Sequence, residues 1–293
     1  MNTKVTVDHL KPWFEALVCP HCRTPLKGEQ TQLTCTNQGC TFPIREGIPT
    51  FLDSAETKPA LDSPDARAMV AGYRTPNAKL IGLRRWITSE YFPGKAWRRA
   101  KQDTLNTAGP VLIIGSGVTR YSGGVHLDLD DFPGVDVVAD AGAIPFRENS
   151  FTGAVCEVVL EHVTHPDQVI AETFRVLQPG GRCFFIVPFL FPFHGHPGDY
   201  RRWSRQGLAE DFAAFQDLET GIHGGPCSAI VNLLSEWLYV LSGARFPKGY
   251  VPIKGAATAL LFPLKFLDLV VNRFPEAHRL AATLFVTGTK PVN

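Results

Sequence analysis

The chain has 293 residues, of which 44% are hydrophobic and 19% are charged. This length and composition are typical of a globular protein of about two domains with a sizeable core. The 29 basic and 28 acidic residues leave a net charge of +1, which excludes a protein-wide positive field that would favour nucleic acid, although a local basic patch is still possible. The first residues, MNTKVTVDHLKPWFE, carry charges and no apolar segment, so we expect no signal peptide and a cytoplasmic protein.

Four of the seven cysteines lie close together near the amino terminus, in the pairs CPHC and CTNQGC. This spacing is typical of a zinc ribbon, in which each pair supplies two thiolates from one tight turn. Disulfides or unrelated free cysteines are the alternatives, and a chain without a secretory signal disfavours disulfides. We predict a zinc ribbon over residues 1–52 with a structural metal, because four thiolates leave no open coordination position. The predicted ligands are Cys19, Cys22, Cys35 and Cys40.

The stretch TFPIREGIPTFL follows the second cysteine pair. Together with the cysteine pairs, it resembles the small zinc-ribbon activator protein that partners RNA and protein methyltransferases. The resemblance covers about residues 15–52, and it implies that the ribbon is fused to an enzyme in this chain.

Residues 53–108 are predicted to be a linker followed by a helical extension. The linker, residues 53–66, is polar and acidic and contains proline, a composition typical of loops. The rest of the extension is rich in basic and aromatic residues, which fits an amphipathic helix with a solvated basic face. The same composition leaves open a surface that grips RNA, a phosphorylated substrate or an anionic membrane.

A buried strand is predicted at VLIIGSG, residues 111–117, where apolar residues run directly into two glycines. Glycine lets a ligand approach the bare backbone, although ordinary turn glycines give the same pattern. Four further apolar runs follow, with a helix predicted from Pro166, and strands alternating with helices indicate a parallel sheet. Ligands bind at the carboxyl ends of such strands. The candidate groups at that edge are Gly115, Asp128, Asp140 and Glu157.

The order VLIIGSG, LDLD, VADAGAIPFRENSF, VCEVVLEHV, RVLQPGG and FFIVPF resembles the class I S-adenosylmethionine-dependent methyltransferases. The resemblance covers about residues 109–220. It implies that Gly115 and Gly117 lie against the methionine part of S-adenosylmethionine, that Asp128 binds the ribose hydroxyls, and that Asp140 with Ala141 reads the adenine edge. The full set of implied cofactor-binding residues is Gly115, Ser116, Gly117, Asp128, Leu129, Asp140, Ala141 and Glu157.

The sequence departs from that family after the glycine loop. Only residues 118–124 separate the loop from the next strand, whereas a full crossover helix needs about a dozen residues. The first crossover is therefore predicted to be abbreviated, and this leaves the ribose contact open between Asp128 and Asp130.

The expected fold is α/β, a Rossmann-like, seven-stranded, doubly wound sheet over residues 109–293 with the small zinc ribbon before it. A sixth strand is predicted at residues 217–225 and a seventh, antiparallel one at 283–290. Between them, at about residues 226–280, lies an insertion of helices with large apolar faces. We favour a roof over an apolar substrate pocket for this insertion; peripheral membrane contact or a dimer interface are the alternatives. The oligomeric state is not predicted.

Substrate chemistry is expected in residues 189–208, which leave the carboxyl edge of the sheet after the fifth strand. Histidine there can take a proton from a nucleophile, and arginine can hold a carboxylate or phosphate. A rigid lid of mutually bonded side chains is the alternative. The candidate catalytic residues are His194, His196 and Tyr200, and the candidate substrate-binding residues are Asp199, Arg201, Trp203 and His162.

These patterns together predict methyl transfer from S-adenosylmethionine to an oxygen or nitrogen of a small-molecule, natural-product or lipid- or glycan-linked acceptor. Two other functions are left open. One is an rRNA or tRNA methyltransferase with a zinc-ribbon recognition module, in which case nucleic acid, not favoured by the net charge, would be the partner. The other is a catalytically inactive partner protein that retains the fold.

Overall fold

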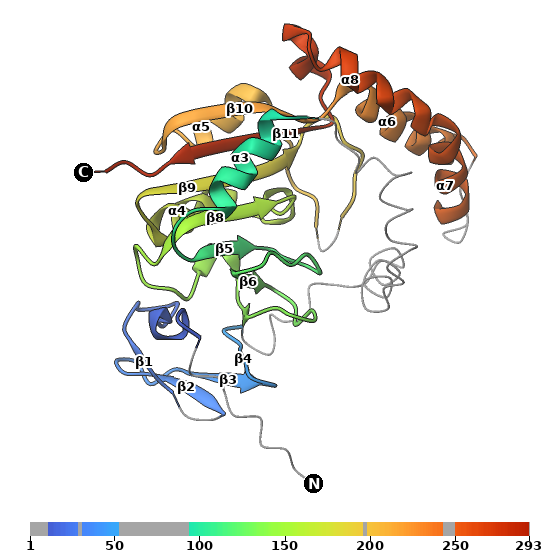
Figure 1. Cartoon of the computed structure of the whole chain (residues 1–293). Helices are drawn as coiled ribbons and strands as arrows, with labels where there is room; N and C mark the ends of the chain where they lie inside the picture. The colour runs from blue at the N-terminus through green and yellow to red at the C-terminus, as the bar shows by residue number, and fades with distance from the viewer. Residues whose placement is uncertain (1–10, 29–30, 53–93, 196–197, 243–249, 293) are drawn as a thin grey trace.

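The structure of the chain is a computed structural model (Figure 1) and describes residues 11–28, 31–52, 94–195, 198–242 and 250–292. Its larger sheet has the strand order β10-β11-β9-β8-β5-β6-β7, in which β11 is antiparallel to both neighbours. This order confirms the predicted Rossmann-like α/β fold and its antiparallel seventh strand. The strands are β5 (Val111–Ile114), β6 (Gly124–Asp128), β7 (Val137–Val138), β8 (Phe151–Glu157), β9 (Leu177–Pro188), β10 (Gln216–Gly224) and β11 (Thr283–Thr289).

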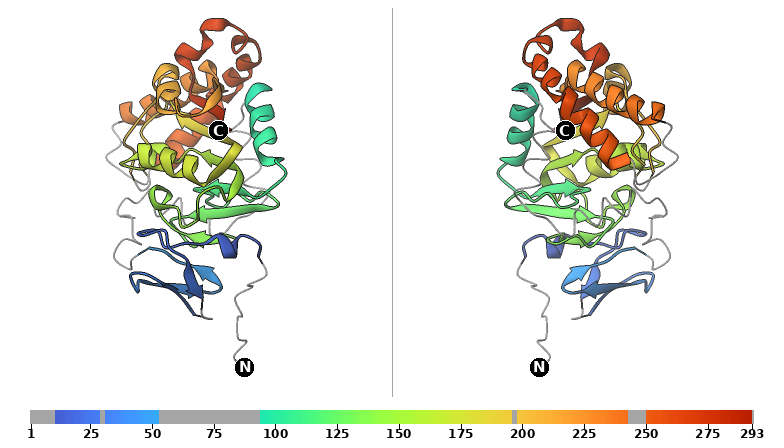
Figure 2. Two further views of the ribbon diagram at one scale, coloured as in Figure 1. Left: turned by 90° about the vertical axis from the view of Figure 1, so that its left-hand side faces the viewer. Right: turned by 90° about the vertical axis from the view of Figure 1, so that its right-hand side faces the viewer.

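Helices cover both faces of this sheet (Figure 2). On one face, α3 (Ala96–Leu105) packs Trp97 and Ala100 against a cluster that includes Phe184. On the other face lie α4 (Pro166–Val176) and α5 (Arg205–Asp211). All four residues of β5 are buried, as expected for a central parallel strand covered on both sides.

The first crossover is short, as predicted. Residues 115–123 join β5 to the parallel strand β6 through turns, with no helix among them. The loop stays compact because the backbone N–H groups of Gly115 and Ser116 both donate to the carbonyl of Leu127, at 2.9 and 3.2 Å.

A separate four-stranded antiparallel sheet, in the order β1-β2-β3-β4, forms the amino-terminal module. A short 3-10 helix, η1 (Phe14–Ala16), precedes it. The predicted linker at residues 53–66 and most of the predicted helical extension lie outside the described residues, and α3 is the described part of the extension. The strands are β1 (Leu26–Gly28), β2 (Gln32–Cys35), β3 (Thr41–Arg45) and β4 (Ile48–Pro49).

The module joins the large sheet through backbone hydrogen bonds along β7 and the loop after it. Thr50 forms a parallel bridge with Val138, and the Phe51 N–H donates to the Val138 carbonyl at 2.8 Å. Further along, the Val18 N–H donates to the Pro145 carbonyl at 3.0 Å. Figure 1 shows β4 beside this edge of the sheet.

Side chains reinforce the same interface. Arg23 pairs with Glu172 at 2.9 Å, and its guanidinium also donates to the carbonyl of Ile144 at 2.9 Å. Phe146 is fully buried, with its ring 6.1 Å from Trp13 of the module and 4.9 Å from Phe151 of β8. Buried residues of both parts belong to one hydrophobic cluster, so the module and the sheet share a core.

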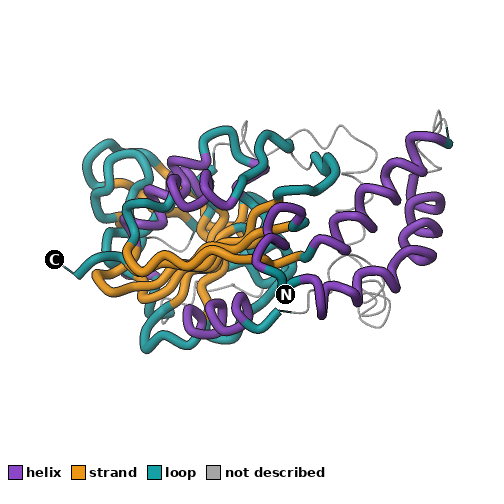
Figure 3. Tube along the Cα trace, turned by 90° about the horizontal axis from the view of Figure 1, so that it is seen from above, coloured by secondary structure: helices purple, strands orange, loops and turns teal. Residues whose placement is uncertain are grey.

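Helices make up most of the described chain between β10 and β11, and they project beyond one end of the sheet (Figure 3). A buried carboxylate anchors them: Asp268 accepts hydrogen bonds from the N–H groups of Cys227 and Ser228, at 2.8 and 3.0 Å. Several of their large apolar side chains are exposed, Trp237 by 55% and Leu260 by 77%. The helices are α6 (Pro226–Leu241), α7 (Tyr250–Leu261), η5 (Phe262–Leu267), α8 (Asp268–Val271) and η6 (Pro275–Leu280).

No helix among the described residues is long and apolar enough to cross a membrane. The roles considered for the insertion, as a roof over a pocket, a membrane contact or a dimer interface, stay predictions.

The shared core predicts a large effect for Phe146→Ala. Truncating a fully buried phenylalanine costs about 3–5 kcal/mol of unfolding free energy, and here the cavity would open between the module and the sheet. Urea denaturation is the measurement. Phe274→Ala is the control because Phe274 is 60% exposed, and a loss of less than about 1 kcal/mol for both variants would contradict the shared core.

Candidate cofactor and acceptor site

The glycine loop after β5 has the backbone shape that its sequence predicted. Gly115 and Gly117 have φ angles of +63° and +50°, a region that residues with a Cβ rarely occupy. A Cβ on Gly115 would lie 2.3 Å from Cγ2 of Val159, whereas a Cβ on Gly117 would meet no atom within 4 Å. Gly115 is therefore required by packing, and Gly117 exposes its backbone to open space in which a ligand can lie.

Asp128 closes this loop from the end of β6. Its carboxylate accepts hydrogen bonds from the N–H groups of Gly117, at 2.7 Å, and Asp130, at 3.1 Å. Burial raises the pKa of Asp128 above its ordinary value, and the two N–H groups offset part of this effect. The structure thus places Asp128, the first of the two candidate ribose ligands, directly against the glycine loop.

A crossover helix is absent from residues 115–123, and the side chain of Arg120 holds the glycine loop instead. Its guanidinium donates to the carbonyls of Gly117, at 2.9 Å, and Thr119, at 2.6 Å, on one side. On the other side it donates to the carbonyl of Pro133 at 3.0 Å. The sequence analysis assigned no role to Arg120, because a single arginine between two loops carries no motif.

The other predicted cofactor residues lie at or after the ends of β5, β6, β7 and β8, and Glu157 among them accepts a hydrogen bond from the Tyr121 hydroxyl of the loop after β5. Ser116 and Ala141 are buried, Leu129 packs beside β7, and Asp140 accepts from the Gly142 N–H at 2.7 Å. Glu157 is already paired, because Lys101 of α3 binds its two carboxylate oxygens at 2.7 and 2.9 Å. Glu157 therefore ties α3 to β8 in this structure.

The strand ends of β8 and β9 bring together two predicted residues, His162 and His194, and a third residue, Glu161. Glu161 and His162 belong to η3 (Leu160–His162), directly after β8, and His194 lies in the segment after β9. The Nε2 atom of His194 is 3.3 Å from Oε1 of Glu161, and the Nε2 atom of His162 is 3.8 Å from the same oxygen. Glu161 is completely buried.

The other predicted residues of the acceptor segment differ in their surroundings. Asp199 supports His194 by accepting from its backbone N–H at 2.9 Å. Although burial opposes ionisation, hydrogen bonds from Arg202 and from the His194 N–H hold the pKa of Asp199 at about 2. Tyr200 is 58% exposed. His196 lies outside the described residues.

Two predicted substrate-binding residues contact the protein itself. Arg201 donates to the carbonyl of Thr164 at 3.2 Å. Trp203 lies in the core, where its indole N–H donates to Asp211 at 2.8 Å. The Trp203 backbone N–H donates to the carbonyl of Pro188 at the end of β9, at 3.1 Å, while its indole ring packs into the core.

Val158 has a strained backbone at the end of β8. Its φ angle is +58°, and a β-branched residue in this region is a genuine outlier. Such strain costs of order 1–3 kcal/mol and concentrates at functional sites. Val158 lies between Glu157 and the turn that carries Glu161, so the strained residue turns the chain from the strand into the acceptor cluster.

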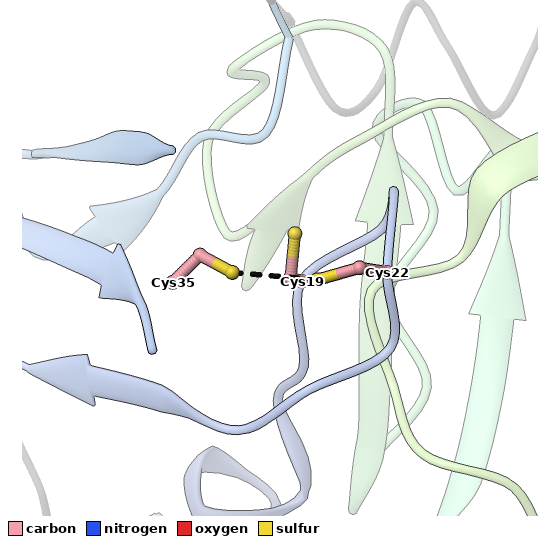
Figure 4. Close-up of side chains that lie close together, drawn as sticks. All are labelled: Cys19, Cys22 and Cys35. Atoms are coloured by element: carbon pink, nitrogen blue, oxygen red, sulfur yellow. Dashed lines mark hydrogen bonds between the residues drawn. The ribbon is translucent and has the colours of Figure 1, made fainter. Parts of the chain in front are cut away.

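Three of the four predicted zinc ligands converge (Figure 4). The sulfur atoms of Cys19, Cys22 and Cys35 all lie within 4.8 Å of one another, and those of Cys22 and Cys35 are 3.4 Å apart. Zinc–sulfur bonds of about 2.3 Å at tetrahedral angles require sulfur separations of about 3.8 Å. The three sulfurs therefore fit three corners of a zinc site.

Cys40 is near this triad but does not complete it. Its sulfur lies 3.8 Å from Oε1 of Gln38, while its carbonyl accepts from the Cys35 N–H at 2.8 Å. A backbone hydrogen bond thus joins Cys35 and Cys40. The Cys40 side chain would have to rotate for its sulfur to become the fourth ligand.

Two family models match the chain. The model described as "Methyltransferase domain" matches residues 124–185, from β6 into β9. The model described as "Trm112p-like protein" matches residues 14–47 of the amino-terminal module. The chain combines a methyltransferase domain with a Trm112p-like module. Both resemblances expected from the sequence are confirmed.

Curated relatives of the methyltransferase domain carry the name ubiquinone/menaquinone biosynthesis C-methyltransferase UbiE. The protein from Bartonella tribocorum is 34% identical over 177 residues, which cover 56% of this chain and 61% of the relative. The protein from a Ruegeria species is 32% identical over 97 residues, 31% of this chain and 39% of the relative. The chain thus spans between about two fifths and three fifths of the length of these relatives.

A solved structure of Haemonchus contortus phosphoethanolamine N-methyltransferase 2 with S-adenosyl-L-methionine is also similar. It is 17% identical, with a TM-score of 0.48, and the match covers 86% of this chain and 62% of that one. This likeness is too distant to assign any residue of the methyltransferase domain.

The hydrogen bonds of Arg120 to carbonyls on both sides of the glycine loop form a clamp. This clamp predicts that Arg120→Lys destabilises the domain. Lysine cannot donate to carbonyls on both sides of the loop, and the lost hydrogen bonds, which are partly exposed to solvent, are worth about 0.5–1.5 kcal/mol each. Urea denaturation should show a loss in that range. Arg147→Lys is the matched control because the Arg147 side chain is exposed, and equal stability of both variants would rule out the clamp.

Proposed function

We propose that the methyltransferase domain transfers the methyl group of S-adenosylmethionine to a small-molecule acceptor at the carboxyl edge of β5, β6, β8 and β9. The observation that carries this proposal is the glycine loop, in which Gly117 faces open space while its N–H donates to the Asp128 carboxylate. Bare backbone offers room for the methionine part, and a carboxylate accepts hydrogen bonds from two vicinal ribose hydroxyls. The family match over β6 to β9 supports the same cofactor.

The acceptor in this proposal is a hydroxylated aromatic ring with an apolar tail. Two observations support it. The relatives are named for ubiquinone and menaquinone biosynthesis, and the helices after β10 expose apolar side chains, among them Trp237 and Leu260, against which such a tail can pack. The sequence favoured oxygen or nitrogen as the methylated atom, whereas the names of the relatives favour a ring carbon.

In the proposed reaction, one carbon–sulfur bond breaks as one carbon–carbon bond forms. The acceptor hydroxyl interacts with the cluster at Glu161 and His194 and loses its proton, which makes the ring carbon nucleophilic. The carbon attacks the methyl group in line with the carbon–sulfur bond, whose electron pair returns to sulfur, and S-adenosylhomocysteine leaves. Loss of the ring proton restores aromaticity. Positioning of the two reactants can supply about 7–11 kcal/mol of the barrier reduction.

The Trm112p-like module has a structural role in this proposal. We propose that Cys19, Cys22, Cys35 and Cys40 hold one zinc ion, and that this ion keeps the module folded against β7. The fit of three sulfurs to a tetrahedral site supports the proposal. Cys40 is the fourth ligand in this proposal because a backbone hydrogen bond to Cys35 keeps it beside the other three cysteines.

Asp128→Asn tests the cofactor site. Hydrogen bonds to a charged group are worth about 1.5–3 kcal/mol, so its loss should weaken S-adenosylmethionine binding about 10- to 150-fold in calorimetry. In an assay with S-adenosylmethionine and a reduced naphthoquinone, the wild type should form a ring-methylated product, and the variant should form it more slowly.

Asp103→Asn is the control for that experiment because Asp103 is exposed on α3. Unchanged affinity in Asp128→Asn would show that the cofactor does not use this carboxylate. A wild type that binds S-adenosylmethionine but methylates only an oxygen would retain the cofactor site and overturn the carbon acceptor.

Zinc removal tests the module. Structural zinc contributes directly to folding free energy, so a strong chelator or Cys22→Ser should remove the thiolate-bound zinc and lower the melting temperature. Elemental analysis and calorimetry are the measurements. Cys227→Ser changes a cysteine outside the module and should keep that zinc, and an unchanged melting temperature after chelation would exclude a structural role.

A further inference from the structure

We propose that Glu161, His162 and His194 form a second metal site, which binds a divalent transition-metal ion at the carboxyl edge of β8 and β9. Their potential ligand atoms all lie within 4.8 Å of one another. This site lies in the methyltransferase domain and shares no ligand with the cysteine site of the Trm112p-like module.

The spacing of the three ligand atoms fits a metal ion. Metal–nitrogen and metal–oxygen bonds of about 2.0–2.1 Å at tetrahedral angles separate neighbouring ligands by about 3.3 Å. His194 Nε2 and Glu161 Oε1 are 3.3 Å apart, and His162 Nε2 and the same oxygen are 3.8 Å apart. The first distance matches this separation, and the second exceeds it by about 0.5 Å.

Both imidazoles have their other nitrogen fixed by an acceptor. His162 Nδ1 contacts the carbonyl of Gly198, and His194 Nδ1 lies 3.2 Å from the carbonyl of Pro192. A carbonyl only accepts hydrogen bonds, so each Nδ1 carries a proton, and in a neutral imidazole the Nε2 atom then presents a lone pair to a metal ion. A histidine that binds metal almost always has this support on its second nitrogen.

The carboxylate lacks a donor. Glu161 has no exposed surface, and neither of its side-chain oxygens has a hydrogen-bond partner within the described part of the chain; the same is true of His194 Nε2. Burying an ion without a partner is strongly unfavourable. The nearby Arg202 guanidinium is already paired with Asp199. A buried carboxylate and two imidazole nitrogens therefore converge, and a bound cation would satisfy all three of them.

Two histidines and one carboxylate leave coordination positions open. Such sets bind zinc in hydrolytic enzymes and iron in oxygenases, and an open position binds water or a substrate oxygen. Resting on the proposed function, the acceptor hydroxyl would coordinate the ion there, which favours loss of its proton and stabilises the resulting oxyanion.

Cobalt(II) titration of the full-length protein tests the metal site without any substrate. The cysteine site, loaded with cobalt, absorbs strongly through thiolate-to-metal charge transfer, whereas a nitrogen and oxygen site shows only weaker visible bands. We expect the wild type to bind one equivalent with these weaker bands in addition to the metal held by thiolates. Each of His162→Gln, His194→Gln and Glu161→Gln should lose this equivalent or weaken its affinity at least tenfold.

His165→Gln is the matched control, since His165 follows η3 closely and is exposed; it should bind cobalt as the wild type does. Melting temperature with and without zinc gives a second readout, and zinc should raise it by more in the wild type than in His194→Gln. Binding of metal only at the cysteine site, or equal binding by all four variants, would overturn the proposal. Because no cofactor or acceptor is present, that outcome would leave methyl transfer untouched.

Discussion

The parallel pairing of β5, β6, β8 and β9 is the constraint on which the rest of this structure depends. Parallel strands end at one edge, so groups far apart in the sequence meet there: the glycine loop after β5, Asp128 at the end of β6, the turn carrying Glu161 after β8, and His194 after β9. The chain then departs from its regular pattern at this edge, with glycines at positive φ and Val158 at +58°. Regular pairing determines where the site lies, and local irregularity shapes it.

The two halves of this edge have opposite electrostatic character. Around the glycine loop, backbone N–H groups and Arg120 supply donors, and the Asp128 carboxylate accepts two of them. Around Glu161, a buried carboxylate and the Nε2 atom of His194 lack a hydrogen-bond partner among the described residues. In the proposed function, the half around the glycine loop binds the cofactor, whose ribose hydroxyls donate to the Asp128 carboxylate, and the half around Glu161 binds the acceptor.

The sequence predicted most of the fold because its signals are local. Apolar runs, turn glycines and the short stretch between residues 118 and 124 each determine nearby structure, and the seven strands, the antiparallel seventh strand and the abbreviated crossover followed from them. Side-chain contacts across the sheet are not local. Nothing near Glu157 in the sequence indicates its pairing with Lys101, and nothing near Trp203 shows that its indole turns into the core. The approach of His194 to Glu161 joins residues more than thirty positions apart in the sequence. Arg120 was missed for the same reason.

The way the Trm112p-like module meets β7 has a consequence for assembly. An outermost strand of a sheet offers unpaired backbone groups to any passing strand, and natural proteins shield such strands. Here Thr50 and Phe51 of the same chain pair with the backbone of Val138 in β7. A free-standing ribbon protein, or a β-strand of another copy, finds that position already taken. Covalent fusion thereby makes the pairing independent of protein concentration and closes this flank to competitors.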